Sequence, residues 1–216
     1  GHHALVKNAL KTLRGTFGDE VHLMAGNVAT LEAFNDLADW GANSIRVGIG
    51  GGSICSTRIN TGHGVPTFQS IHDCSYSNRD VKLIADGGIK NSGDIVKALA
   101  AGADFVMLGS MLAGTDESPG EIFTSGNKKY KVYRGMASRS AQMDWRGQSS
   151  SPEGISTTIP YKGPVADILR DIAGNVRSGF SYTGSRDLRE FQENATFLTQ
   201  TFAGQHESST HILQKG

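Results

Sequence analysis

Four apolar runs, each followed by glycine, constrain the fold of this chain more than any other feature. The runs cover residues 21–25, 44–48, 81–85 and 105–108. Apolar runs that alternate with helical segments are typical of parallel strands buried on both faces. Sheets of this kind bind ligands at the carboxyl ends of their strands, which is where the glycines lie. The sequence therefore predicts an α/β protein with a parallel sheet.

Three helices are predicted to separate and follow these strands. Thr30 is a suitable N-cap for a helix that runs to Trp40 and is closed by glycine. A second helix begins near Pro66, after an unusually long glycine-containing loop. A third helix, capped by Ser92, is expected to run to Ala101. The alternation is that of successive strand-helix units.

Beyond residue 120 the pattern changes. A Ser-Gly-Asn turn at 125–127 predicts a hairpin between strands over 121–124 and 130–133. The remaining predicted segments are a mobile polar flap over 139–152, helices over 165–177 and 185–194, and an extended tail over 202–216.

The number of units suggests half of a barrel. A closed (β/α)8 barrel needs eight strands and about 250 residues, whereas only four strand-helix units precede the hairpin in this chain of 216 residues. Half a barrel leaves two sheet edges and one face of its core uncovered. Either an upstream half is missing or a second copy completes the barrel. We favour a missing upstream half, because no Met precedes Gly1.

Charge and composition narrow the class of partner. The chain has 21 basic and 21 acidic residues, so no electrostatic feature favours nucleic acid or an anionic membrane. No apolar run reaches the roughly 18 residues that suggest a membrane span. Two cysteines in a chain of this length indicate a reducing, cytoplasmic location. We expect a soluble protein that binds a small molecule.

The loop from Gly48 to Arg58 places Cys55 at the tip of a glycine-rich turn. A thiol is a few per cent thiolate at neutral pH and is strongly nucleophilic, so Cys55 could attack an electrophilic ring carbon. It could also be a small buried hydrophobic residue, which is the common state of a lone cysteine.

A second group of residues suits a nucleotide. Asp86 could accept hydrogen bonds from ribose hydroxyls, and the glycines at 87, 88 and 109 could offer backbone N–H groups to a phosphate. Asp86 could instead only cap a turn at the strand end. FMN-dependent barrel oxidases carry a similar Asp-Gly-Gly turn, so this motif alone does not decide the ligand.

The cysteine loop resembles the active-site loop of the IMP dehydrogenase and GMP reductase family, whose pattern is G-x-G-x-x-C-x-T. The resemblance spans nearly the whole chain and implies the C-terminal half of the family's catalytic (β/α)8 barrel, with a hairpin, a flap and a C-terminal tail. It implies that Cys55 attacks C2 of a purine and that Thr57 is the catalytic threonine. Backbone carbonyls of Gly50, Gly52 and Cys55 would bind a monovalent cation, usually potassium.

Two further segments match the family. The run from Tyr133 to Ser138 is similar to Y-R-G-M-G-S, with Ala137 in place of glycine. Glu153 resembles the position whose side chain reads N1 of the base in bacterial IMP dehydrogenases. Glu153 could also be a solvated loop residue. The substrate-binding residues implied by the resemblance are Ser53, Asp86, Gly87, Gly88, Gly109, Ser110, Tyr133, Gly135, Met136, Ala137, Glu153 and Gly154.

The family catalyses two reactions, and the flap favours one of them. In the dehydrogenase a long flap brings an Arg-Tyr pair that activates water, whereas the stretch 139–152 is short and has no Arg-Tyr. Glu117 matches a carboxylate thought to act with the threonine in the reductase, although the dehydrogenase has a glutamate there too. The run from Gly109 to Thr115 looks more like the dehydrogenase. So does the tail, whose Glu207, Ser208 and Ser209 would complete a neighbouring subunit's cation site; Ser209 replaces a histidine.

We therefore expect a purine-nucleotide oxidoreductase, in the first place a GMP reductase that uses NADPH. IMP dehydrogenase with NAD is the alternative. The sequence does not distinguish NAD from NADPH, because the family's contacts with the nicotinamide lie largely upstream of this chain. An FMN-dependent barrel oxidoreductase and an inactive fragment are more distant alternatives. The family further implies a homotetramer.

Overall fold

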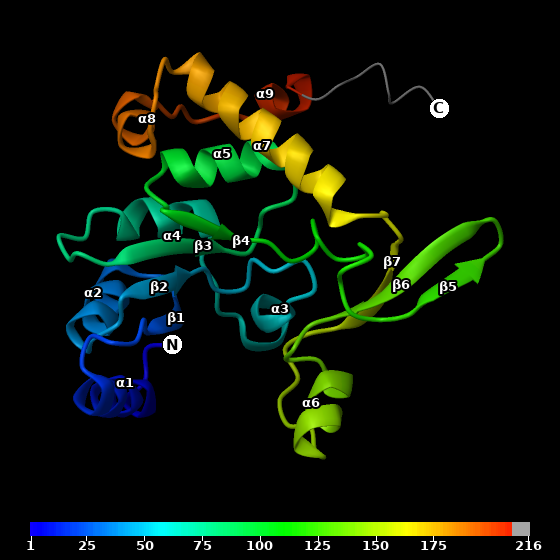
Figure 1. Ribbon diagram of the computed structural model, residues 1–216, viewed down its shortest axis with the longest axis horizontal. Helices are drawn as coiled ribbons and strands as arrows, with labels where there is room; N and C mark the ends of the chain where they lie inside the picture. The colour runs from blue at the N-terminus through cyan, green and yellow to red at the C-terminus, as the bar shows by residue number, and fades with distance from the viewer. Residues whose placement is uncertain (209–216) are drawn as a thin grey trace.

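The computed structural model describes residues 1–208 and contains the predicted parallel sheet. Its strands are β1 (Met24–Val28), β2 (Ser44–Val47), β3 (Lys82–Asp86) and β4 (Phe105–Met107). They pair in parallel in the order β1-β2-β3-β4, as Figure 1 shows. Because all four run the same way, their carboxyl ends and the loops that follow lie along one edge of the sheet. Within residues 1–208 the sheet does not close, which is consistent with part of a (β/α)8 barrel.

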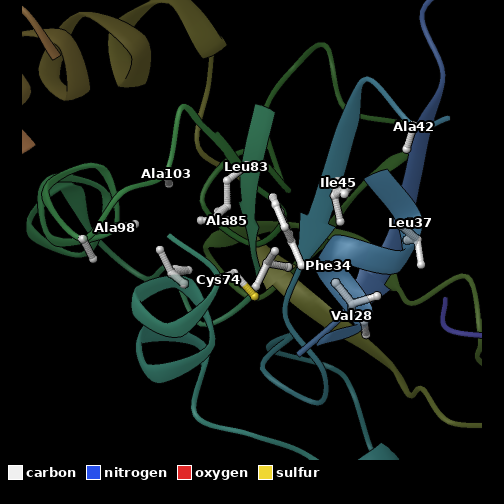
Figure 2. Packing of buried hydrophobic residues seen from close by; sticks show 14 of the residues in the cluster. Val28, Phe34, Leu37, Ala42, Ile45, Cys74, Leu83, Ala85, Ala98 and Ala103 are labelled. Carbon is white, nitrogen blue, oxygen red and sulfur yellow. The ribbon is translucent and has the colours of Figure 1, made fainter. Parts of the chain in front are cut away.

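A row of helices packs on one face of this sheet: α2 (Leu31–Asp39), α4 (Thr67–Cys74) and α5 (Ser92–Ala100). The core lies between the helices and the sheet, where Phe34 and Cys74 meet Ile45 and Leu83 (Figure 2). Burial of large apolar side chains contributes about 1.5–3 kcal/mol each, so this layer fixes the position of the strand ends.

The predicted helix caps are confirmed in one case and wrong in another. Thr30 Oγ1 accepts a hydrogen bond from the Ala33 amide and caps α2 as expected. The cap of α5 is Asn91, whose Oδ1 accepts from the Asp94 amide, and Ser92 is the first helical residue. Asparagine and serine are both good N-caps, so the sequence alone could not decide which of the two adjacent residues caps the helix.

Two helices, α1 (Ala4–Phe17) and α3 (Thr57–Thr61), were not predicted from the sequence. Helix α1 precedes the first strand and buries Leu10 in the core. Helix α3 begins two residues after Cys55, inside the predicted glycine loop. The first strand is shifted by three residues from the predicted run 21–25, because β1 begins at Met24 and continues through Gly26 to Val28.

The second half of the chain forms a separate three-stranded antiparallel sheet. The predicted hairpin is confirmed as β5 (Ile122–Ser125) and β6 (Lys128–Arg134), and β7 (Ser156–Pro160) pairs with the other side of β6. This sheet projects from the body of the molecule in Figure 1. The third strand was not predicted.

Helices account for most of the remaining chain. Helix α6 (Arg139–Arg146) occupies the first part of the stretch 139–152 that we expected to be a mobile polar flap. The two predicted helices are confirmed as α7 (Val165–Tyr182) and α8 (Leu188–Asn194). The expected extended tail is wrong for its first residues, which form α9 (Phe202–Glu207). No helix among residues 1–208 is long and apolar enough to cross a membrane.

Gly48, at the end of β2, should be intolerant of a side chain. Its φ of +143° is accessible mainly to glycine, and an added Cβ would overlap the Asp86 carbonyl on the neighbouring strand. We expect Gly48→Ala to lower the free energy of unfolding by roughly 3 kcal/mol or more, measured by denaturant titration. Gly62→Ala is the control, because Gly62 also has a positive φ but nothing lies within 4 Å of its added Cβ; it should cost only about 1 kcal/mol. Equal losses would contradict the steric explanation.

Candidate active site

The loops at the carboxyl ends of the strands surround one cavity of about 450 Å³. This volume falls in the range of roughly 300–1,000 Å³ that is usual for small-molecule sites. All twelve residues that the resemblance implied for substrate binding line it, together with Cys55 and Gly52. They come from five separate segments: 51–55, 86–90, 107–110, 133–137 and 153–154. The structure therefore brings distant parts of the sequence to one place.

Cys55 is connected to a carboxylate through a hydroxyl. The Cys55 Sγ atom donates to Thr57 Oγ1 at 3.1 Å, and Thr57 Oγ1 donates to Glu153 Oε2 at 2.5 Å. All three side chains are half-buried. A thiol, a hydroxyl and a carboxylate in series form a path along which a proton can pass between sulfur and carboxylate.

Backbone pairing holds this path together. Segments 54–56 and 153–155 run beside each other: the Ser56 amide donates to the Glu153 carbonyl at 2.9 Å, and the Ile155 amide donates to the Ile54 carbonyl at 3.1 Å. The Cys55 amide donates to the Gly52 carbonyl, which closes the turn that presents the thiol. Glu153 is thus fixed beside Cys55 although nearly a hundred residues separate them.

Glu117 does not belong to this group. Its Oε2 atom accepts a hydrogen bond of 2.8 Å from the Val165 amide at the start of α7, and Glu117 is not among the residues that line the cavity. The carboxylate that contacts Thr57 is Glu153. The family resemblance implied Glu117 for this role, whereas the structure places Glu117 against Val165 and away from Thr57.

Asp86 has two partners that the sequence reasoning missed. Asp86 Oδ2 accepts from Arg46 Nη2 at 2.7 Å and Nε at 3.1 Å, and from Asn27 Nδ2 at 2.7 Å. Arg46 and Asn27 lie on β2 and β1, so three neighbouring strands contribute to one carboxylate. The sequence signal that could have indicated Arg46 was its charge, since it is the one charged residue of strand β2. Because all three bonds go to Oδ2, Oδ1 stays available to a ligand.

The glycines after β3 and β4 allow several backbones to approach closely. Gly87 and Gly88 have φ values of +99° and +76°, and a Cβ on Gly87 would lie 3.1 Å from the backbone of Gly51 and Gly52. Tyr133 OH lies 3.2 Å from Ser53 Oγ and next to Gly109, where an added Cβ would be 3.2 Å from that hydroxyl. Hydroxyls and backbone amides without intervening side chains suit an anion such as phosphate.

Of the cation ligands that the resemblance implies, the structure describes all except Ser209. Gly50 takes a positive φ of +78°, and the Gly52 carbonyl already accepts one hydrogen bond from the Cys55 amide. Glu207 lies in α9, and Ser208 Oγ donates to the Gly204 carbonyl at 2.8 Å. Ser209 lies outside the described residues. A carbonyl oxygen has two lone pairs, so Gly52 can still bind a cation.

The two cysteines have different surroundings, and this predicts selective alkylation. Cys74 is 1% exposed, and burial raises the pKa of its thiol to about 12. Cys55 lines the cavity. Because the thiolate is the reactive species, iodoacetamide at pH 8 should label Cys55 in the native protein and Cys74 only after unfolding. Peptide mapping by mass spectrometry measures this; labelling of Cys74 at the same native rate would contradict it.

The flap helix α6 is attached to the wall of the cavity. Ser138 caps it by accepting from the Ala141 amide, and Arg134 forms an ion pair of 2.6 Å with Asp144. The segment that joins β6 to α6 carries Met136 and Ala137, which line the cavity. The flap thus begins at the site itself.

Fold and cavity together define a class: a parallel β/α protein with a ligand cavity at the carboxyl ends of its strands and a cysteine in its wall. A family model described as IMP dehydrogenase / GMP reductase domain matches residues 1–211. The chain belongs to this family of oxidoreductases, which sets aside the FMN-dependent alternative.

Relatives of both kinds are similar to the chain. It is 46% identical to an inosine-5'-monophosphate dehydrogenase from Aquifex aeolicus over 99% of its own length and 46% of that relative's length. It is 43% identical to a GMP reductase from Leishmania major over 100% and 46% of the two lengths. A solved structure of a cysteine-to-alanine variant of GMP reductase from Trypanosoma brucei, in complex with guanosine 5'-monophosphate, matches with a TM-score of 0.93 and 43% identity. That match covers 98% of this chain and 45% of the other. The chain thus spans about half the length of these relatives.

Proposed function

We propose that this chain forms the C-terminal half of the catalytic barrel of a GMP reductase, completed by an N-terminal half-barrel. The observation that carries the proposal is the series Cys55–Thr57–Glu153. This series can take the proton of the thiol and return it to the amino group that leaves C2. The flap, by contrast, contains no Arg-Tyr pair of the kind that activates water in the dehydrogenase. The site is therefore better supplied for expelling ammonia than for hydrolysis.

The substrate would be a purine mononucleotide bound across the cavity. Backbone amides at Gly88 and Gly109 and the hydroxyls of Ser53, Ser110 and Tyr133 would hold the phosphate. Asp86 Oδ1 would accept from the ribose, while Arg46 and Asn27 keep the carboxylate ionised and oriented. Gly135, Met136, Ala137, Glu153 and Gly154 would surround the base.

The first half of the reaction would exchange ammonia for sulfur. The Cys55 thiol would pass its proton through Thr57 to Glu153, and sulfur would form a bond to C2 of GMP. The same proton would return through Thr57 to the 2-amino group. The C2–N bond would then break, and ammonia would leave behind a thioether-linked purine on Cys55.

The second half needs a hydride, which a reduced nicotinamide supplies when bound. Once C2 carries that hydride, the C2–S bond breaks, IMP leaves and the Cys55 thiolate takes one proton from solvent. None of the described residues is assigned to the nicotinamide, and we propose that the N-terminal half provides most of its contacts. The carbonyls of Gly50, Gly52 and Cys55 would hold potassium, which steadies the loop. We further propose a cytoplasmic homotetramer.

IMP dehydrogenase is the second candidate, and the high identity to the Aquifex aeolicus enzyme favours it. The pair Thr57–Glu153 could accept a proton from water as well as return one to an amine. The two candidates share the adduct on Cys55 and differ in its fate.

A pair of assays tests the proposal in a protein that joins this chain to an N-terminal half-barrel. Incubation with GMP and NADPH should consume NADPH and release ammonia, whereas IMP and NAD should give no XMP. XMP formation would establish the dehydrogenase, and no turnover in either assay would favour an inactive fragment.

A further inference from the structure

The loop 109–118, which follows β4 and carries Gly109 and Ser110 of the cavity wall, is attached to the connection between β7 and α7. Lys162 in that connection makes the contact nearest the cavity: its Nζ atom donates to the Ser110 carbonyl at 2.6 Å and to the Met111 carbonyl at 3.0 Å. The Lys162 amide also donates to the Gly114 carbonyl at 2.9 Å. One residue thus bonds three carbonyls of the loop.

Other groups secure the distal part of the same loop. Lys131 on β6 is 3% exposed, and its Nζ atom donates to the Thr115 and Ser118 carbonyls at 2.8 and 2.7 Å. Tyr161 OH donates to Asp116 Oδ1 at 2.6 Å. These contacts hold residues 115–118. Lys162 holds residues 110–114, which include Ser110 of the cavity wall.

The bonds of Lys162 determine where the amides of the loop point. The Leu112 and Ala113 amides both return to the Gly109 carbonyl, so the loop begins with one helical turn. Among the hydrogen bonds of residues 1–208, none uses the Ser110 or Met111 amide as donor. In a planar trans peptide the N–H points opposite to the C=O. The Ser110 carbonyl shares its peptide unit with the Met111 amide, so Lys162, by holding that carbonyl, keeps the free Met111 N–H on the opposite side of the peptide. The Gly109 carbonyl, which accepts from the Leu112 and Ala113 amides, orients the free Ser110 N–H in the same way.

We propose that Lys162 is a positioning residue for the phosphate of the nucleotide, a role that rests on the proposed function. It orients the free amide of Met111, fixes the turn that carries the free amide of Ser110, and places an ammonium charge beside that turn. The Lys162 side chain is exposed overall, yet partial burial lowers the pKa of its ammonium group. That direction reflects the partial removal of the ammonium group from water.

The test compares a ligand with phosphate and one without it. Affinities for GMP and for guanosine are measured by calorimetry in the complete protein. Lys162→Met should weaken GMP binding by about tenfold or more, since two charge-assisted hydrogen bonds are lost, and should leave guanosine binding unchanged. Lys128→Met, at the exposed tip of the hairpin, is the matched control and should change neither affinity.

Unchanged affinity for GMP in Lys162→Met would overturn the proposal, and so would an equal loss of affinity for GMP and guanosine. Should that variant fail to fold, Lys162→Gln and Lys162→Arg replace it. The neutral glutamine should lose the preference for phosphate, whereas arginine, which can donate to both carbonyls, should retain most of it. A wild-type protein that binds neither ligand would instead refute the proposed function.

Discussion

Replacing Cys55 by alanine should lower kcat for GMP reduction by roughly 10⁴-fold or more, because no other described side chain at the site can form the bond to C2. The substitution removes one sulfur atom from the wall of the cavity and leaves the phosphate and ribose contacts in place. The affinity for GMP should therefore change by no more than a few-fold. Steady-state rates of NADPH oxidation and calorimetric binding of GMP measure the two quantities separately.

Cys74→Ala is the matched control for this experiment. Cys74 is buried between α4 and the sheet, so its replacement should cost about 1 kcal/mol of stability and leave kcat near the wild-type value. Retention of turnover by Cys55→Ala would end the covalent mechanism. Loss of turnover in both variants would point to damage to the fold.

Glu153→Gln should slow turnover by about 10²- to 10⁴-fold, which is the usual contribution of general acid–base catalysis. Glutamine keeps the size of the side chain and can still accept from Thr57 Oγ1, but it cannot take up the proton of Cys55. Thr57→Val should have an effect of similar size, and the double variant should be little worse than either one, because the two residues act in series. The measurement is kcat for ammonia release at saturating GMP.

Glu117→Gln separates the two carboxylates that the sequence brought into consideration. The amide oxygen of glutamine can replace Glu117 Oε2 as the acceptor for the Val165 amide, so helix α7 should keep its start and kcat should stay within a few-fold of wild type. A larger loss in Glu117→Gln than in Glu153→Gln would restore the role first inferred for Glu117.

These two glutamates show what the sequence could and could not determine. Local patterns predicted the parallel strands, the hairpin and the cap at Thr30, because each depends on residues within a few positions of one another. The contact between Thr57 and Glu153 joins segments nearly a hundred residues apart, which only the tertiary structure brings together. Sequence reasoning singled out Glu153 for contact with the base but had no means of placing its carboxylate against Thr57.

The partners of Asp86 were missed for a similar reason. Asn27, Arg46 and Asp86 lie on three neighbouring strands, where Arg46 pairs with Gly26 and Ile84, so only the assembled sheet brings the three side chains together. Helix α6 was missed for a different reason: its residues are mostly polar and exposed, so no apolar stripe marked it. Its capping serine and the ion pair between Arg134 and Asp144 instead stabilise it locally.

We propose that Cys55 forms a covalent bond to C2 of a purine nucleotide and that the adduct is not hydrolysed. The most direct measurement mixes the complete protein with IMP and oxidised nicotinamide cofactor in the absence of ammonia. Intact-mass and peptide analysis then follow the protein, and chromatography follows the free nucleotides. We predict a purine ribonucleotide attached to the Cys55 peptide and no XMP in solution. Free XMP would contradict the reductase, and an unmodified Cys55 peptide without XMP would contradict the covalent mechanism itself.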